Sequence, residues 1–159
     1  MGAAEKVHLD ERDARIVQID ELLVVDWQGP VRVDAVVKVG DAIRKSGSEH
    51  PSGVALLMIV REACGVPEPR ARQQIKTTIG EVERHIRAHA TVIEGAGILA
   101  STVRTTINAM RVVIRHRYAE RIFADVPAAI DWLRGELGGG VAWTTQGVRR
   151  AIGGPNRSG

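Results

Sequence analysis

The chain has 159 residues, of which 44% are hydrophobic and 26% are charged, and its formal net charge is +3; this composition is ordinary for a soluble globular protein of one domain. The longest apolar run, VALLMIV at 54–60, is far too short to cross a bilayer, and the charged N-terminus lacks the apolar core of a secretion signal. The single cysteine, Cys64, excludes an intrachain disulfide and a multi-cysteine metal site. These features together favour a cytoplasmic protein.

The first half of the chain reads as two strands, a helix and a third strand. β-branched residues dominate 14–28 and the pair Asp20-Glu21 interrupts them, which predicts strands at about 14–19 and 22–27 joined by a tight turn. Apolar residues at helical spacing then predict a helix that Gly47 closes. VALLMIV follows a loop and is typical of a strand buried on both faces.

The second half continues the alternation. Residues 69–87 predict an amphipathic helix, in which Gly80 is unfavourable and suggests close packing. The remaining predicted elements are a short strand and turn at 89–97, a helix at 98–116, a strand at 121–125 and a helix at 126–137.

This order predicts an α/β domain with a mostly parallel sheet of four to five strands, an N-terminal hairpin and four helices. Right-handed crossovers would place most helices on one side of the sheet. The run Gly138-Gly139-Gly140 is expected to end the domain. The predicted regions are an N-terminal extension at 1–13, the folded domain at 14–137, and a Gly-rich, flexible, basic tail at 138–159.

Four stretches, ARIVQIDELLVVDW, VALLMIV, HATVIEGAG and RIFADVPAAIDWL, occur in an order that resembles the STAS-like superfamily. This superfamily includes the anti-sigma-factor antagonists and the cytoplasmic tails of sulfate transporters, and the chain looks like one of its divergent bacterial members. The resemblance covers about residues 8–137. It implies a STAS-like fold and a regulatory role without catalysis.

The antagonists are switched by phosphorylation of a Ser or Thr just after the central buried strand. The matching segment here is REACGVPEPRARQQ at 61–74, which contains neither residue, and the first hydroxyl is Thr77 inside the next predicted helix. The resemblance therefore implies a member that lacks the phosphoacceptor. Cys64 lies near the missing position, and the sequence leaves open whether it is a reactive thiol or a buried one.

A weak candidate site begins at EGAGILAST, 94–102. Gly95 and Gly97 lie between a strand and a helix, where backbone N–H groups can cradle an anion, and Arg104 follows one turn later. The alternative is that these glycines only make a tight turn. Further candidates for contact with phosphates or acidic side chains are Arg111 and Arg115, which share a helix face with Arg104, and the adjoining pair Arg117 and Tyr118.

The sequence does not favour a metal site, a catalytic site or a nucleic-acid-binding surface. His85 and His89 have the spacing of a helical metal clamp, but the predicted helix ends near Arg87 and no third ligand lies nearby, so no metal is expected. No catalytic or cofactor motif is present, and nucleic-acid binding is not expected without stacking aromatics or a helix-turn-helix. Phe123 and Trp132 are expected to close the core, with Tyr118 half exposed.

These observations predict a non-enzymatic regulatory or scaffold domain that acts through protein–protein interaction, including self-association. The first 26 residues are acidic and residues 70–117 are basic, so subunits could meet through opposite charges. The alternative is a binder of a small anionic or lipid-like ligand, in a pocket between the sheet and the helices at 98–116 and 127–137.

Overall fold

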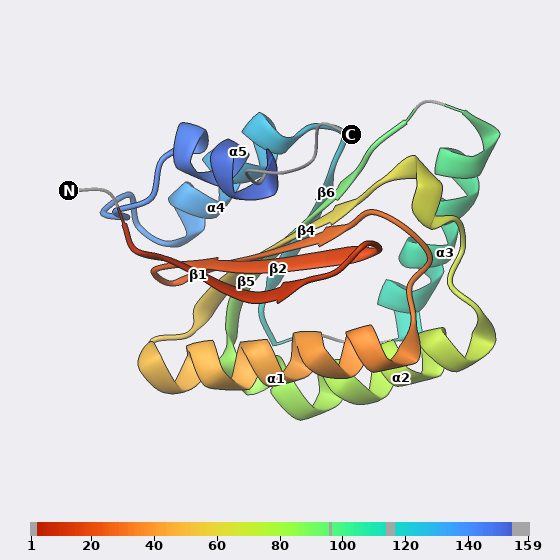
Figure 1. Cartoon of the computed structure of the whole chain (residues 1–159), viewed down its shortest axis with the longest axis horizontal. Coiled ribbons are helices and arrows are strands. Elements are labelled where there is room, and N and C mark those ends of the chain that lie inside the picture. Colours follow the sequence, from red (N-terminus) through yellow and green to blue (C-terminus); the bar gives the residue numbers. More distant parts are fainter. Residues whose placement is uncertain (1–2, 96, 114–116, 154–159) are drawn as a thin grey trace.

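The computed structural model describes residues 3–95, 97–113 and 117–153 (Figure 1). Six strands form one mixed sheet, and their order in the sheet is their order in the chain. β1, β2 and β3 are antiparallel neighbours, whereas β3, β4, β5 and β6 run parallel. The strands are β1 Glu5–Asp10, β2 Ala14–Ile19, β3 Leu22–Trp27, β4 Val54–Val60, β5 Ile86–Ile93 and β6 Ala119–Phe123.

Five α-helices cover the two faces of this sheet. α1, α2 and α3 each connect two parallel strands and lie on one face, while α4 and α5 follow β6 and lie on the other (Figure 1). Successive crossovers of one hand in one direction place their helices on the same face. The helices are α1 Val33–Glu49, α2 Pro69–Val82, α3 Ile98–Val113, α4 Val126–Glu136 and α5 Thr145–Gly153, with short 3-10 turns at Glu62–Cys64 and Glu83–His85.

The β2–β3 hairpin has the predicted boundaries. Its two-residue turn contains Asp20 with a φ of 55°, a left-handed conformation that Asp tolerates better than most residues. Because side chains alternate along a strand, Leu23, Val25 and Trp27 face α1 while Leu22 and Val24 face α4 and α5. Both faces of the central strands are therefore buried, which explains why apolar residues predominate in β3 and make up all of β4.

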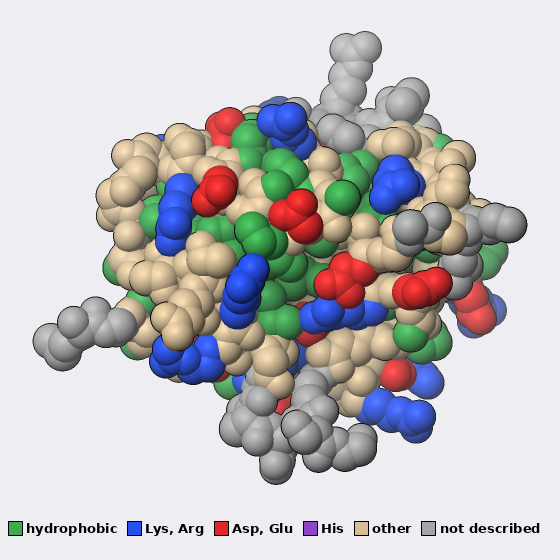
Figure 2. All heavy atoms as spheres, turned by 90° about the horizontal axis from the view of Figure 1, so that it is seen from above, with side chains coloured by type: hydrophobic (Ala, Val, Ile, Leu, Met, Phe, Trp, Pro, Cys, Tyr) green, Lys and Arg blue, Asp and Glu red, His purple; other side chains and the backbone are tan. Residues whose placement is uncertain are grey.

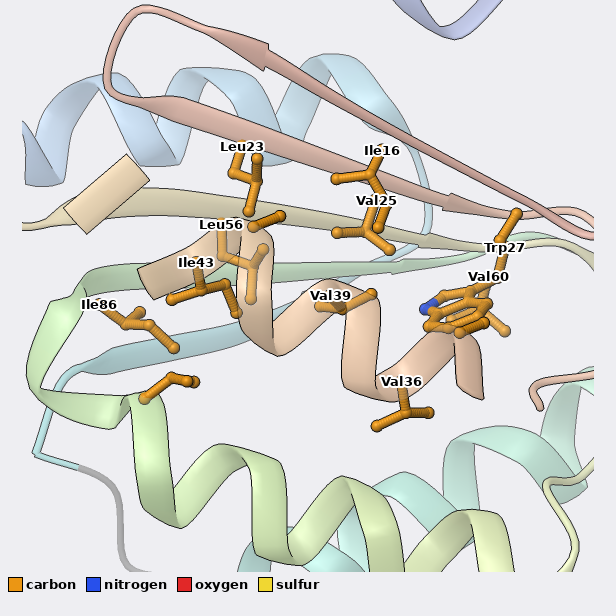
Figure 3. Close-up of a cluster of buried hydrophobic side chains, with 14 of the residues drawn as sticks. Ile16, Leu23, Val25, Trp27, Val36, Val39, Ile43, Leu56, Val60 and Ile86 are labelled. Atoms are coloured by element: carbon orange, nitrogen blue, oxygen red, sulfur yellow. The ribbon is translucent and has the colours of Figure 1, made fainter. Parts of the chain in front are cut away.

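The core between the sheet and α1 is shown in Figure 3. Leu23, Val25 and Leu56 of the strands point toward Val39 and Ile43 of α1. The second core lies on the opposite face, where Ile130 and Leu133 of α4 and Val148 of α5 cover β3, β4 and β5. No helix in the described part of the chain is long and apolar enough to cross a membrane.

Two predicted numbers were wrong: the described residues form a sheet of six strands rather than four or five, and five α-helices rather than four. The additional strand β1 lies within 1–13, and the additional helix α5 lies within 138–159. Neither has a strong local signal, since β1 is charged and α5 is short. Tertiary contacts hold α5, because Trp143 beside it is buried at 2% exposure and the Arg15 side chain donates to the Ala151 carbonyl at 2.9 Å.

The helix predicted at 69–87 ends earlier, at Val82. The 3-10 turn Glu83–His85 follows it, and β5 begins at Ile86. Gly80 does not mark close packing, since a Cβ there would meet nothing within 4 Å. Gly40 of α1 does: a Cβ there would lie 2.7 Å from the Thr78 methyl of α2. The close approach of α1 and α2 therefore depends on a glycine of α1.

Candidate functional site

An apolar cavity of about 130 Å³ lies between the sheet and α1, α2 and α3. Its floor is the middle of the sheet, including Leu56 and Met58 of β4. Its walls are the inward stripes of three helices, which contribute Val39 and Ile43 of α1, Ile75, Ile79 and Val82 of α2, and Val103, Thr106 and Ile107 of α3. These stripes are the apolar faces of amphipathic helices. The cavity is therefore lined by side chains that belong to the hydrophobic core.

The polar lining residues gather on β5 and next to it. His89 and Thr91 of β5, Glu120 of β6 and Tyr118 just before β6 all line the cavity. The His89 Nε2 lies 3.2 Å from the Thr91 hydroxyl oxygen, its Nδ1 lies 3.8 Å from a Glu120 carboxylate oxygen, and its ring is 6.1 Å from that of Tyr118. A buried polar cluster therefore borders an otherwise apolar space.

Strand register explains why the cavity has an apolar side and a polar side. Leu56 of β4 is the partner of His89, and His89 is the partner of Glu120, so the three form a row across the sheet. In the next row Met58 of β4 is the partner of Thr91. The lining thus changes from apolar over β4 to polar over β5 and β6.

A second, open cleft of about 390 Å³ is lined by residues of α3 and of β6. Arg104 and Asn108 of α3 line it together with Glu120 and Arg121 of β6. Glu120 belongs to both spaces, since it also lines the cavity. Among the described residues Arg104 has no hydrogen-bond or ion-pair partner, and the Arg121 guanidinium lies 5.4 Å from the centre of the Phe123 ring.

The turn that contains Gly95 and Gly97, which the sequence suggested as a place to bind an anion, lies next to the carboxylate of Glu62. A Cβ on Gly95 would lie 3.6 Å from the carboxyl carbon of Glu62, and one on Gly97 would lie 4.0 Å from its Oε1. A carboxylate beside the turn repels an incoming anion. Gly95 adopts a φ of 101°, which accounts for a glycine at that position without any ligand.

The candidate contact residues do not form one surface. Arg104 lines the cleft, and Arg117 is exposed. Tyr118 is buried at 8% exposure rather than half exposed, because it packs in the core under α1, α2 and α3. The side chain of Arg111 and the whole of Arg115 lie outside the described residues.

The pocket predicted between 98–116 and 127–137 cannot exist as stated, because α3 and α4 lie on opposite faces of the sheet. The cavity adjoins α3 and is completed by α1 and α2 instead. Sequence reasoning missed the roles of His89 and Glu120. The available signal was a polar residue in the predicted strand at 89–97 and another just before the predicted strand at 121–125, and only the register of β5 and β6 brings them together.

Arg61 holds the carboxyl ends of three parallel strands together. Its Nε donates to Asp26 at 2.9 Å and its Nη1 donates to both Glu94 oxygens at 2.9 Å. Burial lowers the pKa of Arg61, but hydrogen bonds and charges from Asp26 and then Glu94 outweigh it and raise that pKa above its ordinary value. Each charged group of this network therefore has a partner inside the chain, and the three together carry a net charge of −1.

Cys64 is buried beside this network. Its thiol donates to the Trp27 carbonyl at 2.9 Å. Burial is the main cause that raises the pKa of the Cys64 thiol to about 11. A buried, protonated thiol is a poor nucleophile, so the structure favours the inert alternative.

The acidic N-terminal segment does not present a free negative surface. Its carboxylates pair within the chain, in Asp10–Arg15, Asp13–Arg32 and Glu11–Lys38. Figure 2 shows acidic and basic side chains interspersed on the face that carries α4 and α5. On this face, and in these three pairs, opposite charges therefore lie close together.

No known family description matches the sequence, and no curated protein matches it. Similar folds occur among solved structures. An uncharacterised DUF3478-family protein from Shewanella loihica with a SpoIIAA-like fold has 14% identity and a TM-score of 0.50, covering 83% of this chain and 93% of that chain. An anti-sigma factor antagonist from Mycobacterium paratuberculosis has 12% identity and a TM-score of 0.47, covering 79% and 99%.

The Pseudomonas malonate decarboxylase MdcD-MdcE heterodimer has 12% identity and a TM-score of 0.43, covering 90% of this chain and 73% of that chain. The likeness to the Shewanella protein is one of fold. This chain thus has a STAS-like α/β fold, as its sequence predicted.

Proposed function

We propose that this domain is a non-enzymatic binder of a small, largely apolar molecule, which it holds in the cavity between the sheet and α1, α2 and α3. The cavity itself carries this proposal. Protein interiors are close-packed and contain few voids larger than a water molecule. A space of about 130 Å³ among core side chains is much larger than such a void, which is the reason to expect a ligand there.

The size and lining of the cavity define the ligand. An engineered cavity of roughly 150 Å³ with an apolar lining stays dry and binds benzene. The cavity here is close to that size and is lined by aliphatic side chains such as Val39, Leu56 and Ile107. An apolar body of about six carbons is therefore the expected fit, with one polar group facing His89 and Glu120.

Calorimetric titration with benzene and with 1-hexanol tests the proposal. Ile107 lines the cavity and is partly buried, so Ile107→Phe should fill the space, abolish binding and leave the protein at least as stable as the wild type. Ile107→Val is the matched control and should still bind. Failure of the wild type to bind either probe, or undiminished binding by Ile107→Phe, would contradict the proposal.

Self-association is a second candidate function, favoured by a different observation. Val33 and Val37 lie one turn apart on α1 and are 40% and 41% exposed, which is an apolar pair that a second copy of the chain could cover. Because the N-terminal acids pair within the chain, such an interface would be apolar and only weakly dependent on salt. Sedimentation of the wild type and of Val37→Glu tests it: a dimer that Val37→Glu dissociates supports it, and a monomer at high micromolar concentration refutes it.

A further inference from the structure

We propose that the ligand is a small amphipathic carboxylate that enters between α3 and β6, with its apolar body in the cavity and its carboxylate at Arg104. This inference rests on the proposed function, because it specifies the polar group of the molecule bound in the cavity and the orientation in which that molecule binds. It follows from the relation between the cavity and the open cleft.

α3 is the shared wall of the two spaces. Val103 and Ile107 line the cavity, while Arg104 and Asn108 line the cleft. Residues four apart lie one above the other on a helix, so these pairs form two adjoining stripes, one apolar and one polar. A molecule that lies across α3 would meet aliphatic side chains with one end and a guanidinium with the other.

β6 provides the opposite side of this passage. It is the last strand of the sheet and has a neighbour on one side only among the described strands. Glu120 lines both the cavity and the cleft, and its carboxylate lies 3.8 Å from the His89 Nδ1. Glu120 is thus the residue of β6 that borders both the cavity and the cleft.

The charges of the cleft select an anion. Arg104 and Arg121 outnumber Glu120 there, and Asn108 adds an amide that can donate a hydrogen bond. Arg104 has no partner elsewhere in the described chain, so its five N–H donors remain available for a ligand. A guanidinium matches a carboxylate in two parallel hydrogen bonds, whereas it repels an amine.

The experiment compares three six-carbon probes, hexanoate, 1-hexanol and hexylamine, by calorimetry on the full chain. Wild type should bind hexanoate most tightly and hexylamine least. Arg104→Gln should weaken hexanoate binding about tenfold, the expected loss of a charge-assisted hydrogen bond, and leave 1-hexanol binding unchanged. The matched control is Arg149→Gln, which removes the same charge from an exposed position of α5 on the opposite face of the sheet. It should change the binding of neither hexanoate nor 1-hexanol.

Each outcome separates the two proposals. If hexanoate and 1-hexanol bind wild type equally, or if Arg104→Gln weakens both equally, the carboxylate assignment is wrong while the apolar cavity site stands. If Arg149→Gln reduces hexanoate binding as much as Arg104→Gln does, the effect is one of net charge and the assignment to Arg104 is refuted. If none of the three probes binds, the proposed function and this inference both fail.

Discussion

At the scale of single residues, Cys64 shows how burial decides chemistry. Its place after the central strand leaves a reactive thiol possible on sequence grounds, but the structure buries it against the Trp27 carbonyl. Burial raises its pKa to about 11 from 9.0, so at pH 8 the thiolate fraction falls about a hundredfold below that of an exposed thiol.

We predict that native protein reacts with a thiol reagent at pH 8 at least a hundredfold more slowly than denatured protein, as followed by absorbance. Because the folded pKa exceeds the unfolded value, the protonated thiol stabilises the fold below about pH 9, and this contribution is lost as the pH rises toward 11. Equal labelling rates for native and denatured protein would show that Cys64 is accessible and ionised.

At the scale of secondary structure, two glycines inside helices have opposite roles. Gly40 of α1 faces the Thr78 methyl of α2, whereas Gly80 of α2 has open space around it. Gly40→Ala should therefore destabilise by about 1–3 kcal/mol through overpacking, and Gly80→Ala should stabilise by about 1 kcal/mol through helix propensity. Urea denaturation of both variants measures this. If the two substitutions shift stability in the same direction, the described packing of α1 on α2 is wrong.

The elements that could be predicted are those with a clear local pattern of apolar and turn residues in the sequence. β2 and β3 are rich in β-branched residues, β4 is a continuous apolar run, and turn residues bound all three, so their boundaries were predicted correctly. α5 lies in the segment that was predicted to be a flexible tail, because its stability comes from contacts distant in sequence, such as Arg15 with Ala151. The cavity was misplaced for a related reason: the face on which a helix lies depends on the direction of each crossover, and the pairing of His89 with Glu120 depends on register.

At the scale of the whole molecule, the segment after α4 completes the second core. Trp143 is buried, its indole N–H donates to Glu21 at 3.1 Å, and the Arg134 guanidinium lies 5.3 Å from its ring centre. Trp143→Ala should destabilise the domain by about 3–5 kcal/mol, whereas Trp132→Phe, at a partly buried position, should cost less. Thermal unfolding compares them. A melting temperature unchanged by Trp143→Ala would mean that 138–153 does not pack on the sheet in solution.

The central claim is that the interior between the sheet and three helices receives the apolar part of a ligand. The most direct measurement is a crystal structure of the protein with 6-bromohexanoate, in which anomalous scattering locates the bromine at the apolar end of the probe. The account predicts a bromine peak among Val39, Leu56 and Val103, with the carboxylate near Arg104. A peak confined to the protein surface, or none at a saturating concentration of the probe, would contradict it.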